Sequence, residues 1–272
     1  MPEYALGHSE VELERLGVQA RLVEPITRRF FEAAGVAEGM HVLDVGSGVG
    51  DVAFLAAELV GRSGEVVGTD RSAEALRIAR RRAHERSLEN VTFVEGDTSE
   101  LTFERSFDAV VGRYVLQFQP DPSAMLRKIV AHARTGGVVV FHEPYRGGVH
   151  SHPPVRSYEE AFALVNETIE RLGANLSLGL ELHSTFVAAG LPAPTLRLEA
   201  LVASGALSPE HVRYEMDLLP TLWSEMQRLG IAPTDVENAE SWVERVLGDV
   251  AAAESVVDGR AEVGAWSTAG GH

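Results

Sequence analysis

The sequence contains no cysteine among its 272 residues. Disulfide bonds, thiolate nucleophiles, cysteine zinc sites and cysteine-bound iron–sulfur clusters are therefore excluded. Long apolar runs are missing as well, because no stretch approaches the roughly 18 residues that a membrane span needs. The charged and polar segment at 1–17 does not resemble a secretory signal. We therefore expect a soluble, cytoplasmic protein without a membrane partner.

Positive charge is scarce in this chain. Lys and Arg number 24 against 40 Asp and Glu, which gives a formal net charge of -16. Such a chain repels nucleic-acid backbones unless a local basic face compensates. The one basic cluster, RIARRRAHER at 77–86, is typical of a solvated helix face with its cations toward the C-terminal end of the helix dipole. We therefore expect no nucleic-acid partner.

What the sequence does have is an alternation of short apolar runs and helical patterns from residue 41 onward. The apolar runs predict strands at 41–46, 65–70, 91–97, 107–114 and 137–144. Helical patterns separate them; Ser72 caps one, and Asp121 and Pro122 open the last as N-cap and N1. Nearly continuous apolar strands with intervening helices indicate a parallel sheet covered on both faces. This is a doubly wound α/β fold, in which ligands bind beyond the C-terminal ends of the strands.

Helical patterns also dominate the rest of the chain. Residues 1–37 predict an N-terminal helical cap, which starts at the capping box SEVE and which Pro25 kinks or divides. Two further capping boxes, SYEE at 157–160 and TDVE at 234–237, predict the starts of later helices.

The chain shows no internal repeat, low-complexity tract or clear linker. We therefore expect a single domain of residues 1–272, in which helical lids surround one sheet. The lids would comprise 147–180 and 205–252, and the sheet core 38–146, 181–204 and 253–272.

Residues 41–60 read HVLDVGSGVGDVAFLAAELV, a strand pattern, a glycine-rich turn and a helical pattern. In the dinucleotide fingerprint G-x-G-x-x-G a third glycine would stand at position 51. Asp51 stands there instead, and its carboxylate would compete with a pyrophosphate for the positive end of the helix. A phosphate-binding P-loop is excluded, because no Gly-Lys-Ser/Thr follows.

The pattern Asp44-x-Gly46-x-Gly48-x-Gly50 resembles motif I of the class I S-adenosylmethionine-dependent methyltransferases. The resemblance extends over about 38–145, and the whole chain is similar to small-molecule enzymes of the menaquinone and ubiquinone type and their natural-product relatives. It implies a Rossmann-like, seven-stranded sheet, mostly parallel with an antiparallel last strand. It also implies S-adenosylmethionine as the cofactor.

The resemblance assigns cofactor contacts residue by residue. Asp70, with Arg71 after it, would accept hydrogen bonds from the ribose hydroxyls, and Asp97 and Thr98 would lie against the adenine. The methionine part of the cofactor would meet the end of the fourth strand at Arg113. Its carboxylate would sit on glycine N–H groups of the turn, while acidic residues suit its ammonium group. In the family, N-terminal segments fold over the cofactor, which makes Tyr4 a cofactor candidate and His8 a substrate candidate.

The cofactor carries the reactive methyl group, so the protein has to position an acceptor behind it and, where necessary, remove a proton. His142 and Glu143 end the fifth predicted strand and are the candidates for the catalytic residues. The helical lids point to a small acceptor, which we expect to be aromatic or heterocyclic. Side chains on or near the lids that are candidates for its pocket are Tyr114, Phe118, Tyr158, Phe162, Tyr214, Met216, Trp223 and Met226, of which Tyr114, Phe118, Tyr158 and Trp223 are the substrate-binding candidates.

Other functions stay open. The pair in HSH at 150–152 lacks a further ligand at fixed spacing, so we expect no metal. A nicotinamide-dependent oxidoreductase would need glycine at 51 and a hydride-site signature such as Tyr-x-x-x-Lys, and neither is present. A noncatalytic protein that uses the fold to sense the cofactor or bind a partner is the second alternative.

Overall fold

The computed structural model describes residues 10–204 and 209–270, and the chain forms two compact units. We call Val23–Glu143, Leu178–Leu198 and Val263–His272 the core unit. The helical unit comprises Met1–Leu22, Pro144–Ser177 and Glu199–Glu262. The single-domain organisation stays a prediction, and each unit is described by itself below.

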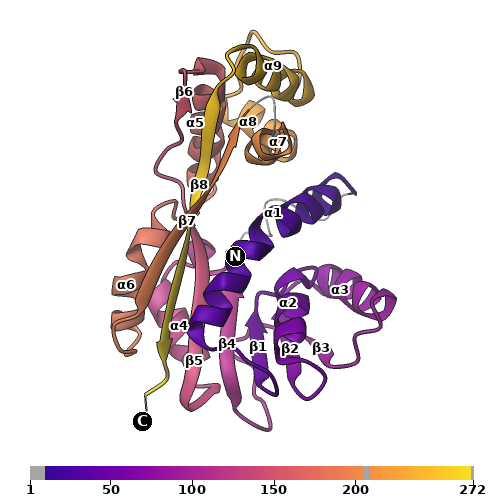
Figure 1. Cartoon of the computed structure of the whole chain (residues 1–272), viewed down its shortest axis with the longest axis vertical. Helices are drawn as coiled ribbons and strands as arrows, with labels where there is room; N and C mark the ends of the chain where they lie inside the picture. Colours follow the sequence, from indigo (N-terminus) through magenta and orange to yellow (C-terminus); the bar gives the residue numbers. More distant parts are fainter. Residues whose placement is uncertain (1–9, 205–208, 271–272) are drawn as a thin grey trace. The chain divides into compact units, whose positions relative to one another are not determined.

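The sheet follows the strand order expected of a doubly wound fold. Its parallel part runs β3-β2-β1-β4-β5 (Figure 1). These strands are β1 (His41–Val45), β2 (Glu65–Asp70), β3 (Val91–Glu95), β4 (Phe107–Arg113) and β5 (Ala133–Tyr145).

The last strands complete the sheet and change its direction. Strand β8 (Val256–Thr268) follows β5, with β7 (Thr195–Ser204) on β8. The predicted fold is confirmed as a mostly parallel sheet with antiparallel last strands. One strand is additional: the two-residue β6 (Ser151–His152) pairs antiparallel with the start of β8, so the described residues form a sheet of eight strands where seven were expected.

The helices between the parallel strands begin where their capping residues predict. Ser72 accepts a hydrogen bond from the Ala75 N–H at 3.2 Å, and Asp121 accepts one from the Ala124 N–H at 2.9 Å. These helices are α2 (Asp51–Val60), α3 (Ala73–Glu85), η1 (Leu116–Phe118) and α4 (Pro122–Val130), and α6 (Leu178–Ala188) precedes β7. Helix α1 (Glu10–Ala34) runs through Pro25 without a break, so the predicted division into two helices is wrong.

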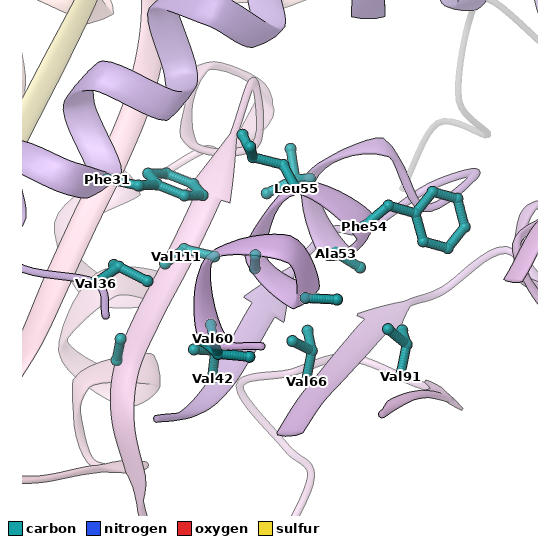
Figure 2. Packing of buried hydrophobic residues seen from close by; sticks show 14 of the residues in the cluster. Phe31, Val36, Val42, Ala53, Phe54, Leu55, Val60, Val66, Val91 and Val111 are labelled. Atoms are coloured by element: carbon teal, nitrogen blue, oxygen red, sulfur yellow. The ribbon is translucent and has the colours of Figure 1, made fainter. Parts of the chain in front are cut away.

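A hydrophobic cluster fixes α2 and part of α1 on the sheet (Figure 2). Helix α2 has apolar residues on most of its surface, and Phe54, Leu55 and Val60 are at most 1% exposed. Phe31 of α1 belongs to the same cluster, which also contains side chains of β1, β2, β3 and β4. Burying each such side chain is worth about 1.5–3 kcal/mol. The start of α2, which carries the glycine turn, is thus held firmly against the strand ends.

The helical unit has its own core. It contains α5 (Arg156–Arg171), α7 (Pro209–Met216), α8 (Leu218–Leu229) and α9 (Ala239–Ala252). Their buried faces share one hydrophobic cluster, which includes Tyr158, Phe162 and Trp242.

Two predicted capping boxes of this unit are wrong. Helix α5 begins one residue before Ser157, whose hydroxyl donates to Asp249 of α9 instead of capping its own helix. Helix α9 is capped by a reciprocal Asn238–Ser241 pair downstream of the predicted box at 234–237. The box predicted at 9–12 has its N-cap, Ser9, outside the described residues. Within the described part of the chain, no helix has both the length and the hydrophobicity to cross a membrane.

Candidate functional site

Polar residues gather in one row at the carboxyl ends of the parallel strands. In the pairing register Asp70 lies opposite Glu95, and Arg113 lies opposite His142. Val45, which ends β1, is opposite the residues that precede Asp70 and Arg113. The row therefore crosses the point between β1 and β4 where the strand order reverses, which is where open α/β sheets bind ligands.

The glycine turn after β1 requires glycine for two different reasons. Gly46 has φ 66°, and a Cβ there would lie 2.6 Å from Val115 Cγ2. A Cβ on Gly50 (φ 95°) would lie 2.6 Å from the Phe54 ring. Gly48 also has a positive φ, yet a Cβ on it would meet nothing within 4 Å. The turn is packed at both ends and faces open space at its middle glycine, as a cradle for a ligand does.

Asp70 fastens this turn to the end of β2. Its Oδ2 accepts a hydrogen bond from the Gly48 N–H at 2.9 Å, and its Oδ1 accepts one from the Ser72 N–H at 2.8 Å. The Gly48 N–H is therefore already engaged and does not lie free for the carboxylate of a ligand. Each oxygen of Asp70 keeps further acceptor capacity, because a carboxylate accepts about four hydrogen bonds.

Asp97 and Thr98 follow β3, where they meet Arg71 and Thr69. Burial opposes ionisation of Asp97, but hydrogen bonds from Ser99 and the Arg71 guanidinium outweigh it and lower the pKa of the carboxyl. The Thr98 hydroxyl lies 2.6 Å from that of Thr69, with both side chains buried. Arg71 therefore acts in this structure as the partner of Asp97.

Asp44 is the unusual residue of the site. It is 1% exposed, and neither carboxylate oxygen has a hydrogen-bond partner among the described residues. Burial raises its pKa well above the usual range, and the charge of Arg113 and the nearby backbone N–H of Ala53 only partly offset that effect. A buried carboxylate without a partner is costly unless a ligand supplies one. The charge that would satisfy it is positive.

A second unusual feature links β4, β5 and helix α1. Arg113, at 9% exposure, donates from Nη1 to Thr27 Oγ1 at 3.1 Å. The same hydroxyl lies 3.1 Å from Nδ1 of His142, which is fully buried. The His142 ring also makes edge contacts with Phe30 and Tyr114, at 5.0 and 5.5 Å between ring centroids. Thr27 thus joins two of the predicted site residues.

Glu143 holds the turn that follows β4. Its Oε1 accepts hydrogen bonds from the N–H groups of Val115 at 2.9 Å and Leu116 at 2.8 Å, and its side chain is fully buried. Tyr114, just before this turn, has φ 59°, a left-handed conformation that is rare for a bulky residue. The contacts of Glu143 are those of a residue that orders the rim, and its catalytic role stays a prediction.

The basic cluster at 77–86 is more than a solvated face. Arg82 donates to the Val49 carbonyl at 2.7 Å and to Asp51 at 2.6 Å, so it fastens the glycine turn from α3. The guanidinium of Arg86 lies over the Phe54 ring. The expected solvated face is therefore wrong for Arg82, which is partly buried, whereas Arg86 is exposed.

The remaining predicted residues do not all join this row. Phe118, in η1, is 42% exposed. Tyr158 and Trp223 belong to the helical unit, where Tyr158 is fully buried and donates to the Asp258 carbonyl at 2.6 Å. Tyr4 and His8 lie outside the described residues.

In the HSH segment at 150–152, His150 forms an ion pair with Asp258. His150 Nδ1 lies 2.9 Å from Asp258, which raises the His150 pKa. In residues 10–204 and 209–270, no three acidic or histidine side chains gather as a metal site would require.

Sequence reasoning missed Thr27, Thr69 and Ser47. Thr27 joins Arg113 to His142, Thr69 donates to the Asp44 carbonyl at 3.2 Å, and the Ser47 Oγ is buried in the glycine turn without a partner among the described residues. Ser47 lies between two glycines of the motif, so its place in the turn could have been predicted from the sequence. Thr27 is one helical residue among many, and no motif marks it.

A comparison with protein families shows the family of the chain. Residues 37–190, more than half of the chain, match the model of a methyltransferase domain. The chain belongs to this methyltransferase family. The matched segment contains the glycine turn and every strand-end residue described above.

Two curated relatives are similar over about half of the chain. Demethylmenaquinone methyltransferase from Lactococcus lactis is 38% identical over 127 residues, which is 46% of this chain and 48% of that protein. Aklanonic acid methyltransferase DauC from a Streptomyces species is 36% identical over 146 residues, or 53% of this chain and 66% of that protein. The chain thus matches about half to two thirds of the length of these relatives.

Solved structures share the fold over most of the chain. The YcgJ protein from Bacillus subtilis superposes with a TM-score of 0.57 at 18% identity, covering 89% of this chain and 97% of that one. The [4+2]-cyclase SpnF gives a TM-score of 0.56 at 21% identity, covering 92% of this chain and 83% of that one. At these identities the likeness concerns the fold alone.

Proposed function

We propose that this methyltransferase binds S-adenosylmethionine at the strand ends and transfers its methyl group to an O, N or C atom of a small aromatic or heterocyclic metabolite. The observation that carries the proposal is Asp44, buried, unpartnered and beside Arg113. A zwitterionic amino-acid group complements this pair, because its ammonium suits Asp44 and its carboxylate suits Arg113.

The other residues of the row fit the nucleoside part of the cofactor. Asp70 keeps acceptor capacity for the two ribose hydroxyls while it holds Gly48 and Ser72. The hydrogen bonds described above lower the pKa of Asp97, and its carboxylate provides an acceptor for an adenine amino group. Gly48 presents bare backbone to open space between these groups. Because the Gly48 N–H donates to Asp70, we assign the cofactor carboxylate to Arg113 and not to the glycine N–H groups of the turn.

The bound cofactor supplies an electrophilic methyl group. The chain has three tasks: to hold the acceptor in line with that methyl, to exclude water and to take a proton where the acceptor carries one. Positioning of this kind contributes about 7–11 kcal/mol to a bimolecular step. His142, at the end of β5, is the candidate base. The Thr27 hydroxyl donates to the Val23 carbonyl, which leaves its oxygen to accept from Nδ1–H of His142, and in that tautomer Nε2 is the atom that receives the proton.

Two observations support a small acceptor. Both curated relatives are named for small organic acceptors, a demethylated menaquinone and aklanonic acid. The net charge of -16 disfavours nucleic acid.

Calorimetric titration tests the cofactor. We expect the protein to bind S-adenosylhomocysteine and to show no binding of NADH. Binding of NADH alone would overturn the proposal in favour of a nicotinamide enzyme. Turnover is tested with methyl-tritiated S-adenosylmethionine and two acceptor classes, naphthoquinols and polycyclic aromatic acids, by counting label in the extracted organic phase.

The turnover assay is needed because the fold also occurs in a [4+2]-cyclase. Binding of S-adenosylhomocysteine with label transferred to a member of either class supports the proposal. Binding without label in any product favours a noncatalytic cofactor-sensing role.

A further inference from the structure

Thr27 lies in the second half of α1 and is fully buried. Its hydroxyl has three neighbours at hydrogen-bond distance: Arg113 Nη1 at 3.1 Å, His142 Nδ1 at 3.1 Å and the Val23 carbonyl at 3.2 Å. The guanidinium only donates, so Thr27 Oγ1 always accepts from Arg113. The single hydroxyl hydrogen then goes to Val23 or to His142.

The position of Arg113 poses a physical question. Asp44 is a buried carboxylate, and Arg113 is near enough to oppose the effect of burial on its ionisation. Two opposite charges that are already buried attract each other strongly, and a direct ion pair would offset part of their desolvation cost. Arg113 nevertheless donates to Thr27, and both oxygens of Asp44 stay without a hydrogen bond among the described residues.

We propose that Thr27 is a positioning residue that holds Arg113 off Asp44, so that the Asp44 carboxylate stays open for the ammonium group of the cofactor's amino-acid end. Without the hydroxyl, Arg113 turns to Asp44 and closes the amino-acid subsite with an internal ion pair. The ammonium and the carboxylate of the ligand then lose their partners together. The inference rests on the proposed cofactor and concerns only how the chain keeps its site open.

The test compares two ligands that differ in the amino-acid end. S-adenosylhomocysteine carries it, and 5′-methylthioadenosine has the same adenosine thioether without it. We expect Thr27→Val, which removes the hydroxyl at nearly constant volume, to weaken S-adenosylhomocysteine by about tenfold and leave methylthioadenosine within about twofold of the unmodified protein. Thr27→Ser, which keeps the hydroxyl, should restore the affinity for S-adenosylhomocysteine.

A matched control separates this role from general destabilisation. Thr168 is also a fully buried helical threonine, whose hydroxyl donates to the Leu164 carbonyl at 2.7 Å in the helical unit. Thr168→Val should change neither affinity. A crystal structure of Thr27→Val should show Arg113 within ion-pair distance of Asp44.

Equal weakening of both ligands by Thr27→Val, or no weakening of either, overturns the inference. If Thr27→Val does not fold, Thr27→Ala serves in its place, with the same two ligands and the same criteria. Absence of S-adenosylhomocysteine binding in the unmodified protein would instead overturn the proposed function, so the two failures are distinguishable.

Discussion

The Gly48 N–H donates to Asp70 Oδ2 at 2.9 Å, which ties the glycine turn after β1 to the end of β2. One carboxylate therefore shapes the turn and, under the proposed function, also receives the ribose hydroxyls. The glycine turn and the end of β2 are therefore coupled, and the effects of substitutions at Gly48 and Asp70 on ligand affinity should not be additive.

Asp70→Ala should weaken binding of S-adenosylhomocysteine by about 1–3 kcal/mol, because the ribose hydroxyls lose a charged acceptor and the turn loses its anchor. Calorimetry measures this. Asp108→Ala is the control, since Asp108 also accepts a backbone N–H, that of His41 at 2.8 Å, but lies near the opposite end of its strand. Equal affinities for Asp70→Ala and the unmodified protein would remove Asp70 from the site.

The glycines of the turn should separate stability from binding. Gly46→Ala combines a left-handed φ with a clash against Val115, so we expect the free energy of unfolding to fall by about 2–5 kcal/mol. Gly48→Ala has the backbone cost alone, about 1–2 kcal/mol, but its methyl group enters the cradle and should lower the affinity for S-adenosylhomocysteine. Gly136→Ala, also at positive φ and exposed, controls for backbone cost without an effect on binding. Denaturant unfolding and calorimetry give the two quantities.

The parallel strands, α2 and the row of strand-end residues were predictable from the sequence because their signals are local. Apolar runs, a turn of alternating glycines and the caps Ser72 and Asp121 each act within a few residues. The order of strands then brings Asp70, Asp97 and Arg113 to one edge without further information.

The predictions of capping boxes at 157–160 and 234–237 were wrong because a four-residue pattern does not show which distant side chains can also form hydrogen bonds with its members. Ser157 finds Asp249, 92 residues away, and the Asn238–Ser241 pair caps α9 with residue types that the S/T-x-x-E pattern does not include. Thr27 lies beyond prediction for the same reason. Its partners Arg113 and His142 are 86 and 115 residues distant, and only the folded chain brings them together.

His142→Ala tests the role of the candidate base. If His142 Nε2 receives a proton from the acceptor, we expect turnover to fall by about 10²- to 10⁴-fold while the affinity for S-adenosylhomocysteine changes little. The reason is that removing a base affects the chemical step and not the groups that hold the cofactor. The measurement uses the tritium assay, with the acceptor that gives turnover, and calorimetry on the same preparation. An intact rate would reject the role of base and leave His142 as a packing partner of Thr27.

Glu215, buried in the helical unit, should give the stability of the protein a dependence on pH. Burial raises its pKa to about 8, although nearby Arg146 favours the ionised form. The folded chain thus keeps a proton that the unfolded chain releases near the ordinary pKa of about 4.3. This contribution to stability is complete below that ordinary value and is lost as the pH rises toward 8, at up to about 1.4 kcal/mol per pH unit.

Glu215→Gln places a neutral side chain of the same shape at that position and removes the titration. Relative to the unmodified protein, the variant should gain stability progressively between pH 5 and 8, and the difference should then level off, because above about pH 8 both the folded and the unfolded chains carry the charge at Glu215. Denaturant unfolding followed by tryptophan fluorescence, to which Trp223 and Trp242 of the helical unit contribute, measures the difference at each pH. A difference that is constant over this range would show that Glu215 is ionised in the folded protein, with the ion pair to Arg260 at 3.3 Å outweighing burial.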